Sequence, residues 1–286
     1  MMGLKRLDLF LPAAFAFVGA GTAVQAVPAI GLLANGSLFS FDTATPGTNT
    51  TIGTVTGLQG SEIVYGLDYR PANGALYALG STGRLYTVNT VTGAATLAST
   101  LSTGLSGSGF DIAFNPVPDR LRIVSNSGQN LRVNVDTGVV TVDTSLAFAA
   151  GDPNFGTAPS VVAVGYTNQF AGAATTTLFD INGVPAVLAT QNPPNNGTLN
   201  TVGATNGSLI SLDIASDSGI ASGASGSSFY TVNLATGSAS LVGAFAASTV
   251  TDFTLLPVAE PLSAALFGLG LTGLAVARRR RSPPAG

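Results

Sequence analysis

The chain has 286 residues, of which 45% are hydrophobic and only 9% are charged, and it contains no His, no Cys and no Trp. The absence of imidazole and thiol groups excludes a Ser-His-Asp triad, a Cys nucleophile, a zinc site of the usual His/Cys kind and a disulfide. Any catalysis must therefore use carboxylates, Arg, Tyr or hydroxyl groups. The high apolar content with low net charge also argues against intrinsic disorder.

Residues 1–26 have the pattern of a secretory signal peptide. Lys5 and Arg6 lie in a short basic start, an apolar stretch follows at residues 9–18, and small residues lead to Ala26. This order is typical of a segment that signal peptidase removes; the alternative is an ordinary buried N-terminal helix. We expect cleavage after Ala26 and a secreted mature chain, which its core alone must stabilise because it has no cysteine.

A repeated phrase organises residues 27–257, which we expect to form a single domain. An apolar-aromatic strand followed by a Gly-containing turn begins at Leu38, Leu85, Leu131, Leu178 and Phe229, at intervals of 47, 46, 47 and 51 residues. A period of this length indicates one supersecondary unit repeated along the chain.

The clearest unit, residues 63–97, contains four short strands joined by tight turns such as Asn73-Gly74. Its first strand is apolar throughout, as expected of an innermost strand, whereas its third strand alternates. Four-stranded units in radial repetition form a β-propeller. We therefore predict an all-β, five-bladed β-propeller of four-stranded antiparallel blades, closed by residues 250–256 beside residues 29–57. A β-solenoid or sandwich is the alternative, because the units at 161–203 and 208–245 are less cleanly divided.

The most distinctive stretches are residues 66–71, 110–122, 128–132, 166–168 and 191–197. Together they are similar to the domain of unknown function numbered 4394, which is found in secreted bacterial proteins. The resemblance spans about residues 32–255. It implies a secreted protein, and it brings neither an assigned activity nor catalytic residues.

Arginines gather in one unit of the repeat. The candidate ligand-binding residues are Arg120, Arg122, Arg132, Asn115 and Asp119. The structural interpretation is that these arginines pair with Asp111, Asp119 or Asp136. The functional one is contact with a small anionic ligand or a uronic acid, because the guanidinium fork matches a carboxylate.

Acidic residues recur on the predicted innermost strands. They are Asp68, Asp111, Asp213 and Asp252, and the innermost strand of the unit at 161–203 carries no acidic residue. A ring of like charges is costly unless each carboxylate accepts backbone N–H bonds or the ring shares a cation. Three interpretations remain open: caps of the blade-to-blade turns, a calcium site, and paired carboxylates for glycoside hydrolysis. We therefore expect no cofactor, with calcium as the one alternative.

The body is acidic, with five Arg, 12 acidic residues and no Lys between residues 27 and 257. Nucleic-acid binding needs clustered Lys or Arg to neutralise phosphates. We therefore expect no nucleic-acid partner.

The C-terminal segment, residues 258–286, has three parts in a fixed order. Glu260 and Pro261 precede an apolar run at residues 262–277, and a cluster of Arg278, Arg279, Arg280 and Arg281 follows. Sixteen residues at about 1.5 Å each span about 24 Å, short of the roughly 30 Å hydrocarbon core, so a helix here would be a marginal membrane span with its arginines on the cytoplasmic side.

Residues 258–281 resemble the PEP-CTERM sorting signal of Gram-negative bacteria that make exopolysaccharide, although Ala259 stands where that family usually has Pro. The resemblance implies transient anchoring in the inner membrane and removal of the tail by an exosortase. A permanent C-terminal anchor is the alternative.

These observations predict a non-enzymatic protein of the cell envelope or extracellular matrix that binds exopolysaccharide or another surface protein. A carboxylate-based extracellular glycan hydrolase or lyase is one alternative, because fold does not determine function. A calcium-stabilised structural scaffold is the other.

Overall fold

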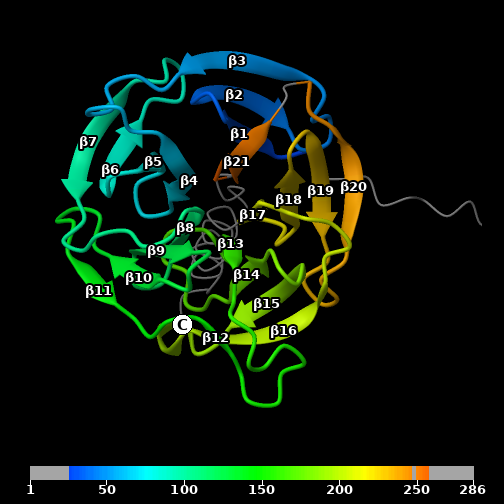
Figure 1. The fold of residues 1–286 in the computed structure, drawn as a ribbon. Helices are drawn as coiled ribbons and strands as arrows, with labels where there is room; N and C mark the ends of the chain where they lie inside the picture. Colours follow the sequence, from blue (N-terminus) through cyan, green and yellow to red (C-terminus); the bar gives the residue numbers. More distant parts are fainter. Residues whose placement is uncertain (1–25, 247–248, 258–286) are drawn as a thin grey trace, which may run out of the picture.

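The computed structural model describes residues 26–246 and 249–257. They form five antiparallel sheets around a central axis, like the blades of a propeller (Figure 1). From the axis outward, the strands are β21 (Val250–Leu255), β1 (Pro28–Leu33), β2 (Ser37–Asp42) and β3 (Asn49–Thr54) in blade 1; β4 (Val64–Arg70), β5 (Ala75–Gly80), β6 (Arg84–Val88) and β7 (Ala95–Thr100) in blade 2; β8 (Phe110–Asn115), β9 (Arg120–Ser125), β10 (Asn130–Val133) and β11 (Val140–Val142) in blade 3; β13 (Val161–Tyr166), β14 (Leu178–Asn182), β15 (Val187–Gln191), β16 (Thr198–Ala204) and β12 (Ala147–Phe148) in blade 4; and β17 (Ser211–Ile214), β18 (Ala221–Ser225), β19 (Ser228–Val232) and β20 (Ala239–Ala244) in blade 5.

The prediction of a five-bladed propeller closed by strands from both ends of the chain is confirmed. β21 pairs antiparallel with β1, with Ala29 opposite Leu255 in the register. Blade 1 therefore combines the first and last strands of the described chain (Figure 1). Neither a solenoid nor a sandwich has this arrangement.

Burial falls from the axis outward within each blade. β8 is buried at all but its last position, whereas β7 is exposed or half-buried throughout. The outermost strands β3 (NTTIGT) and β7 (ATLAST) are rich in Thr, whose branched side chain suits a strand and whose hydroxyl tolerates water. The sequence thus places its Leu, Ile and Phe where blades meet.

Five clusters of buried side chains fill the spaces between neighbouring blades. The cluster between blades 5 and 1 is the most aromatic, with Phe41 packed edge-on against Phe245 at a centroid distance of 5.1 Å. Phe229 and Phe253 also pack together there, at 5.4 Å. The ring is therefore closed by aromatic packing as well as by strand pairing.

Blade 4 departs from the predicted repeat in two ways. The phrase at Leu178 lies on β14, the second strand of its blade, whereas the phrases at Leu85, Leu131 and Phe229 lie on third strands. β14 and β15 are both short and buried, so their apolar patterns do not distinguish them. In addition, β12 pairs parallel with β16 and gives this sheet a fifth strand.

Residues 1–25 and 258–286 lie outside the described residues, and with them the flanking helices expected of the signal peptide and of the sorting signal. Within the described ranges, no helix is long and apolar enough to span a bilayer.

Candidate functional site

The innermost strands surround a central channel (Figure 1), and its two ends differ, because the first residues of these strands line one pocket and their last residues line another. A wide pocket lies where these strands begin, beside Val64 of β4 and Phe110 of β8. A small cavity lies where they end, beside Ile214 of β17 and Leu255 of β21. The acidic residues predicted on the innermost strands lie between these ends.

Four innermost strands carry an aspartate whose carboxylate joins two blades. We call Asp68, Asp111, Asp213 and Asp252 the interblade carboxylates. Each accepts a hydrogen bond from a backbone N–H on the innermost strand of the next blade. The donors are the N–H groups of Phe114, Val164, Leu255 and Leu67, respectively, at 2.6, 2.8, 2.7 and 2.6 Å.

Each interblade carboxylate also accepts a second hydrogen bond. In Asp68, Asp111 and Asp213 it comes from the N–H of the next residue in the same strand, at 2.7 to 2.8 Å. In Asp252 it comes from the hydroxyl of Ser211 at 2.6 Å. The bonds thus join strand to strand across each junction rather than capping the turns between blades, and they satisfy backbone groups that neighbouring blades would otherwise leave unpaired.

The junction between blades 4 and 5 has no acid of this kind within the described residues, because β13 (VVAVGY) carries none. Ala163 of β13 packs there against Leu212 and Ile214 of β17. This junction depends on apolar contact, whereas each of the other four adds a hydrogen bond from a backbone N–H to a carboxyl group.

Burial is the main influence on the acidity of the interblade carboxylates. It raises the pKa of Asp213 to about 6 and that of Asp252 to about 7, against the opposing effect of their hydrogen bonds. Burial raises the pKa of Asp68 and Asp111 well above the ordinary value, and repulsion from Asp213 and Asp252, respectively, adds to the shift. Like charges this close disfavour simultaneous ionisation of both groups.

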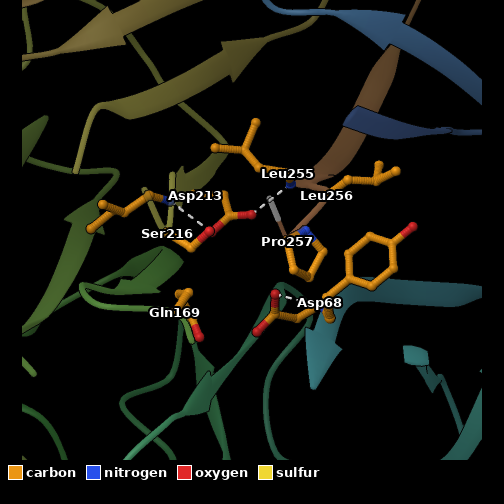
Figure 2. Close-up of a pocket in the computed structure, with 9 residues that line it drawn as sticks. Asp68, Gln169, Asp213, Ser216, Leu255, Leu256 and Pro257 are labelled. Atoms are coloured by element: carbon orange, nitrogen blue, oxygen red, sulfur yellow. Dashed lines mark hydrogen bonds between the residues drawn. The ribbon is translucent and has the colours of Figure 1, made fainter. Parts of the chain in front are cut away.

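Asp68 and Asp213 meet at the narrow end of the channel (Figure 2). The hydroxyl of Thr254 lies 3.3 Å from one carboxylate and 3.1 Å from the other. The cavity beside them has a volume of about 10 Å³. That is about the space of one water molecule, so a sugar ring cannot reach this carboxylate pair.

The pocket at the opposite end of the channel, beside Val64 and Phe110, is here called the wide mouth pocket. Its volume is about 580 Å³, which is within the range of small-molecule sites. Side chains from the start of the innermost strands line it, including Tyr65, whose ring stacks on that of Phe110 at 4.9 Å. Ile63 and Ile210 stand at its rim and are 60% and 36% exposed. The pocket therefore presents aliphatic and aromatic surface to the solvent.

Several polar side chains that line the wide mouth pocket are hydrogen-bonded within the protein. Glu62 accepts hydrogen bonds from the hydroxyls of Tyr86 and Thr82, and although burial raises its pKa, these bonds outweigh burial and lower it. The Ser108 hydroxyl accepts a bond from the Asn126 amide. The hydroxyl of Thr251 donates to the carbonyl of Leu32, and the Asn35 side-chain oxygen accepts the N–H of Ser37. The pocket thus combines apolar surface with polar groups that already have partners.

The predicted ligand-binding arginines lie in blade 3, and two of them share one acidic partner. Arg122 is 1% exposed and bonds Asp143 at 2.6 Å, and Arg132 bonds the same carboxylate at 2.7 Å. Arg122 also bonds the side-chain oxygens of Asn130 and Asn195. This places its guanidinium inside a hydrogen-bonded network between blades 3 and 4. Asp143 was not among the partners predicted from the sequence.

Arg120 lies apart from that network and donates to the backbone carbonyls of Pro118 and Asp119. Together with Arg132 it lines a surface pocket of about 280 Å³. The carboxylate of Asp119 instead pairs with Arg70 of blade 2, which also pairs with Asp136, each at 2.6 Å. Asn115 accepts the backbone N–H of Val117. The bridge between blades 2 and 3 thus rests on Arg70, which sequence reasoning missed because its partners are distant in the chain.

A metal site made of three acidic, His or Cys side chains does not occur within residues 26–246 and 249–257. The four interblade carboxylates are spread along the channel: Asp68 and Asp213 line the narrow cavity, while Asp111 and Asp252 lie outside its lining.

Comparisons with known proteins identify one family and two similar solved structures. A family model described as "Domain of unknown function (DUF4394)" matches residues 37–254. A search of curated proteins finds no match. Among solved structures, a chain of a nidogen/laminin complex is 10% identical with a TM-score of 0.46, and the match covers 81% of this chain and 98% of that one. A structural genomics protein of unknown function from Bacteroides thetaiotaomicron VPI-5482 is 13% identical with a TM-score of 0.46, over 82% and 68% of the two chains.

Proposed function

Since the chain belongs to the DUF4394 family, whose function is unassigned, we propose from its geometry that it is a secreted, non-enzymatic binding module of the cell surface or extracellular matrix. Its site is the wide mouth pocket, and its ligand is a surface protein that inserts an apolar side chain there. The observation that carries the proposal is an exposed apolar rim, Ile63 and Ile210, beside polar lining residues that are hydrogen-bonded within the protein, namely Glu62, Ser108 and Thr251.

Exopolysaccharide is the less favoured ligand of this pocket. Sugar recognition needs free donors and acceptors placed around the ring, and the polar side chains of Glu62, Ser108 and Thr251 are engaged within the protein. The acidic body would also repel an acidic polymer. An apolar side chain needs no free hydrogen-bonding group and carries no charge, and its transfer out of water lowers the free energy.

A non-enzymatic role is supported by the occupation of the interblade carboxylates. Their oxygens accept backbone N–H groups across the blade junctions, and the small cavity beside Asp68 and Asp213 has no room for a glycan. A glycosidase needs two carboxyl groups on opposite sides of a bound sugar, about 5 to 9.5 Å apart. We therefore assign these aspartates to stability.

The route to the surface is part of the proposal. Signal peptidase would release the chain after Ala26, the segment at residues 262–277 would hold it transiently in the inner membrane of a Gram-negative bacterium, and an exosortase would act near Glu260 and Pro261. Replacing Arg278 to Arg281 with Gln would then leave the unprocessed chain in the membrane fraction. Normal processing of that variant would refute the sorting assignment.

Photo-crosslinking in intact producer cells tests the binding site. A photoreactive phenylalanine analogue placed at Ile63 should give a discrete protein adduct, and a second substitution, Ile210→Asp, should abolish it. The matched control carries the same analogue at Val91, which is 80% exposed on a turn outside the pocket.

Three results would count against the proposal. Equal adducts at positions 63 and 91 would mean non-specific contact. Absence of an adduct together with co-sedimentation of the purified protein with the producer's exopolysaccharide would favour the polymer as ligand. Release of reducing ends from that polymer, lost in Asp68→Asn, would mean that the protein is a hydrolase.

A further inference from the structure

Two side chains from loops complete the small cavity at the narrow end of the channel. Gln169 and Ser216 follow β13 and β17, and they line the cavity with Asp68 and Asp213 (Figure 2). Leu256 and Pro257 cover its outer side. These four polar residues come from three blades and, together with Tyr69, bring oxygen-bearing side chains to the lining of one space of about 10 Å³.

Gln169 is buried there without a protein partner. The residue is only 8% exposed, and neither its amide oxygen nor its amide nitrogen makes a hydrogen bond. The hydroxyl of Ser216 is likewise buried and unpaired. Most buried polar groups in folded proteins bond to protein or to ordered water, so two unpaired groups that line one cavity point to a water molecule or an ion between them. Asn168, in the left-handed region with φ 57°, shapes the turn that brings Gln169 to this position.

The charge of the cavity identifies the kind of ligand. Asp68 and Asp213 are both buried, and each accepts two backbone N–H bonds, while the single hydroxyl hydrogen of Thr254 can serve only one of them. Since a carboxylate has about four lone pairs, each of them keeps acceptor capacity. Two carboxylates that repel each other are stabilised by a cation between them. No cationic side chain lines the cavity.

We propose that the narrow end of the channel binds a calcium ion through the side-chain oxygens of Asp68, Asp213, Gln169 and Ser216. The donor set is entirely oxygen, which suits a hard cation. The two carboxylates, the amide and the hydroxyl offer at most six oxygens, which is the lower limit of calcium coordination. Magnesium keeps several of its waters, and a cavity of about 10 Å³ holds about one.

This site differs from the four-aspartate set predicted from the sequence. Asp111 and Asp252 do not line the cavity, whereas the neutral residues Gln169 and Ser216 do. The calcium site is also independent of the wide mouth pocket, which lies at the other end of the channel. Calcium here would hold blades 2, 4 and 5 together at the end where β21 closes the ring.

Calcium titration of the full-length chain, purified in mild detergent and stripped with chelator, tests the proposal. The melting temperature should rise by about 5 to 10 °C when calcium reaches 100 times its Kd. Gln169→Leu changes a loop residue and should fold; it should weaken calcium binding at least tenfold. Asp213→Asn should abolish binding. Magnesium at the same concentration should give a smaller rise.

Asp111→Asn is the matched control, because it makes the same chemical change to an interblade carboxylate outside the cavity. It should lower the starting melting temperature and keep the full calcium-dependent rise. Absence of a calcium effect in the unmodified chain would overturn the proposal. Retention of the full effect in Gln169→Leu or Asp213→Asn would place the cation elsewhere and overturn it as well.

Discussion

Asp180 makes a quantitative prediction about the dependence of stability on pH. It lies on β14 opposite Val164 and Ala189, inside the cluster that packs blade 4 against blade 3. Its residue is 0% exposed, and neither carboxylate oxygen has a hydrogen-bond partner. Burial raises its pKa from 3.8 to about 8, although the charge of Arg122 acts in the opposite direction.

The sign follows from proton binding. Between pH 4 and 8 the folded protein keeps the proton on Asp180 and the unfolded chain loses it, so the free energy of unfolding must fall as pH rises. Each pKa unit corresponds to about 1.4 kcal/mol, and pH 7 lies about three units above the unfolded value. Asp180 therefore costs the folded state about 4 kcal/mol at pH 7 and almost nothing at pH 4.

Asp180→Asn removes the titration and keeps the shape. Its free energy of unfolding, from urea denaturation followed by far-UV circular dichroism, should equal that of the unmodified protein at pH 4 and exceed it by up to about 4 kcal/mol at pH 7. Because the other buried acids titrate in both proteins, the difference between the two isolates Asp180.

Asp152 is a control of opposite sign: burial raises its pKa, but its hydrogen bonds from Thr201 and Asn154 outweigh burial and lower it. Relative to the unmodified protein, Asp152→Asn should therefore lose stability as pH rises through the region at and just below 3.8, and the difference should then stay nearly constant up to pH 7. A difference between Asp180→Asn and the unmodified protein that does not change from pH 4 to pH 7 would refute the reasoning.

Two matched pairs of substitutions test other parts of the fold by urea denaturation. Arg122→Met leaves the buried carboxylate of Asp143 with one partner fewer and should cost about 3 to 5 kcal/mol, whereas Arg132→Met, at a side chain 33% exposed, should cost at most about 1 kcal/mol. Equal losses would mean that burial does not set the strength of this network. Gly138 and Gly74 both have positive φ, 73° and 66°, but only at Gly138 would a Cβ overlap a backbone carbonyl of the neighbouring blade. Gly74→Ala should cost about 1 to 2 kcal/mol and Gly138→Ala about 1 to 3 kcal/mol more; similar losses would contradict the close approach of the blades.

The blade count could be predicted from the sequence because turns and apolar phrases are local signals. The repeat pattern at Leu178 was assigned to the wrong strand of blade 4, because β14 and β15 are similarly buried and their apolar patterns do not distinguish them. The position of an aspartate on an innermost strand was also readable. The hydrogen-bond partners of each carboxylate could not be predicted from the sequence, because they lie far along the chain. One donor to Asp252, for example, is the N–H of Leu67, 185 residues away.

The candidate sites were less predictable for the same reason. Arg70 meets Asp119 and Asp136 across 49 and 66 residues of chain, and no local pattern marks them as partners. Gln169 directly follows a stretch that carries the family resemblance, but its isolation from other polar groups is visible only in three dimensions. Pockets are formed by ring closure, so they have no signature in any single repeat.

The composite blade sets an order of events during synthesis. Blades 2 to 5 are each built from neighbouring stretches of chain and can form as the chain emerges, whereas β1 must wait for β21, whose Thr251 reaches Leu32 across 219 residues. Contacts of such long range form slowly, and until they form the inner edge of β1 is an unpaired strand open to other chains. The ring therefore closes only when the last strand is present. A chain that stops before residue 250 has four whole blades, but its first blade lacks the innermost strand and the ring stays open.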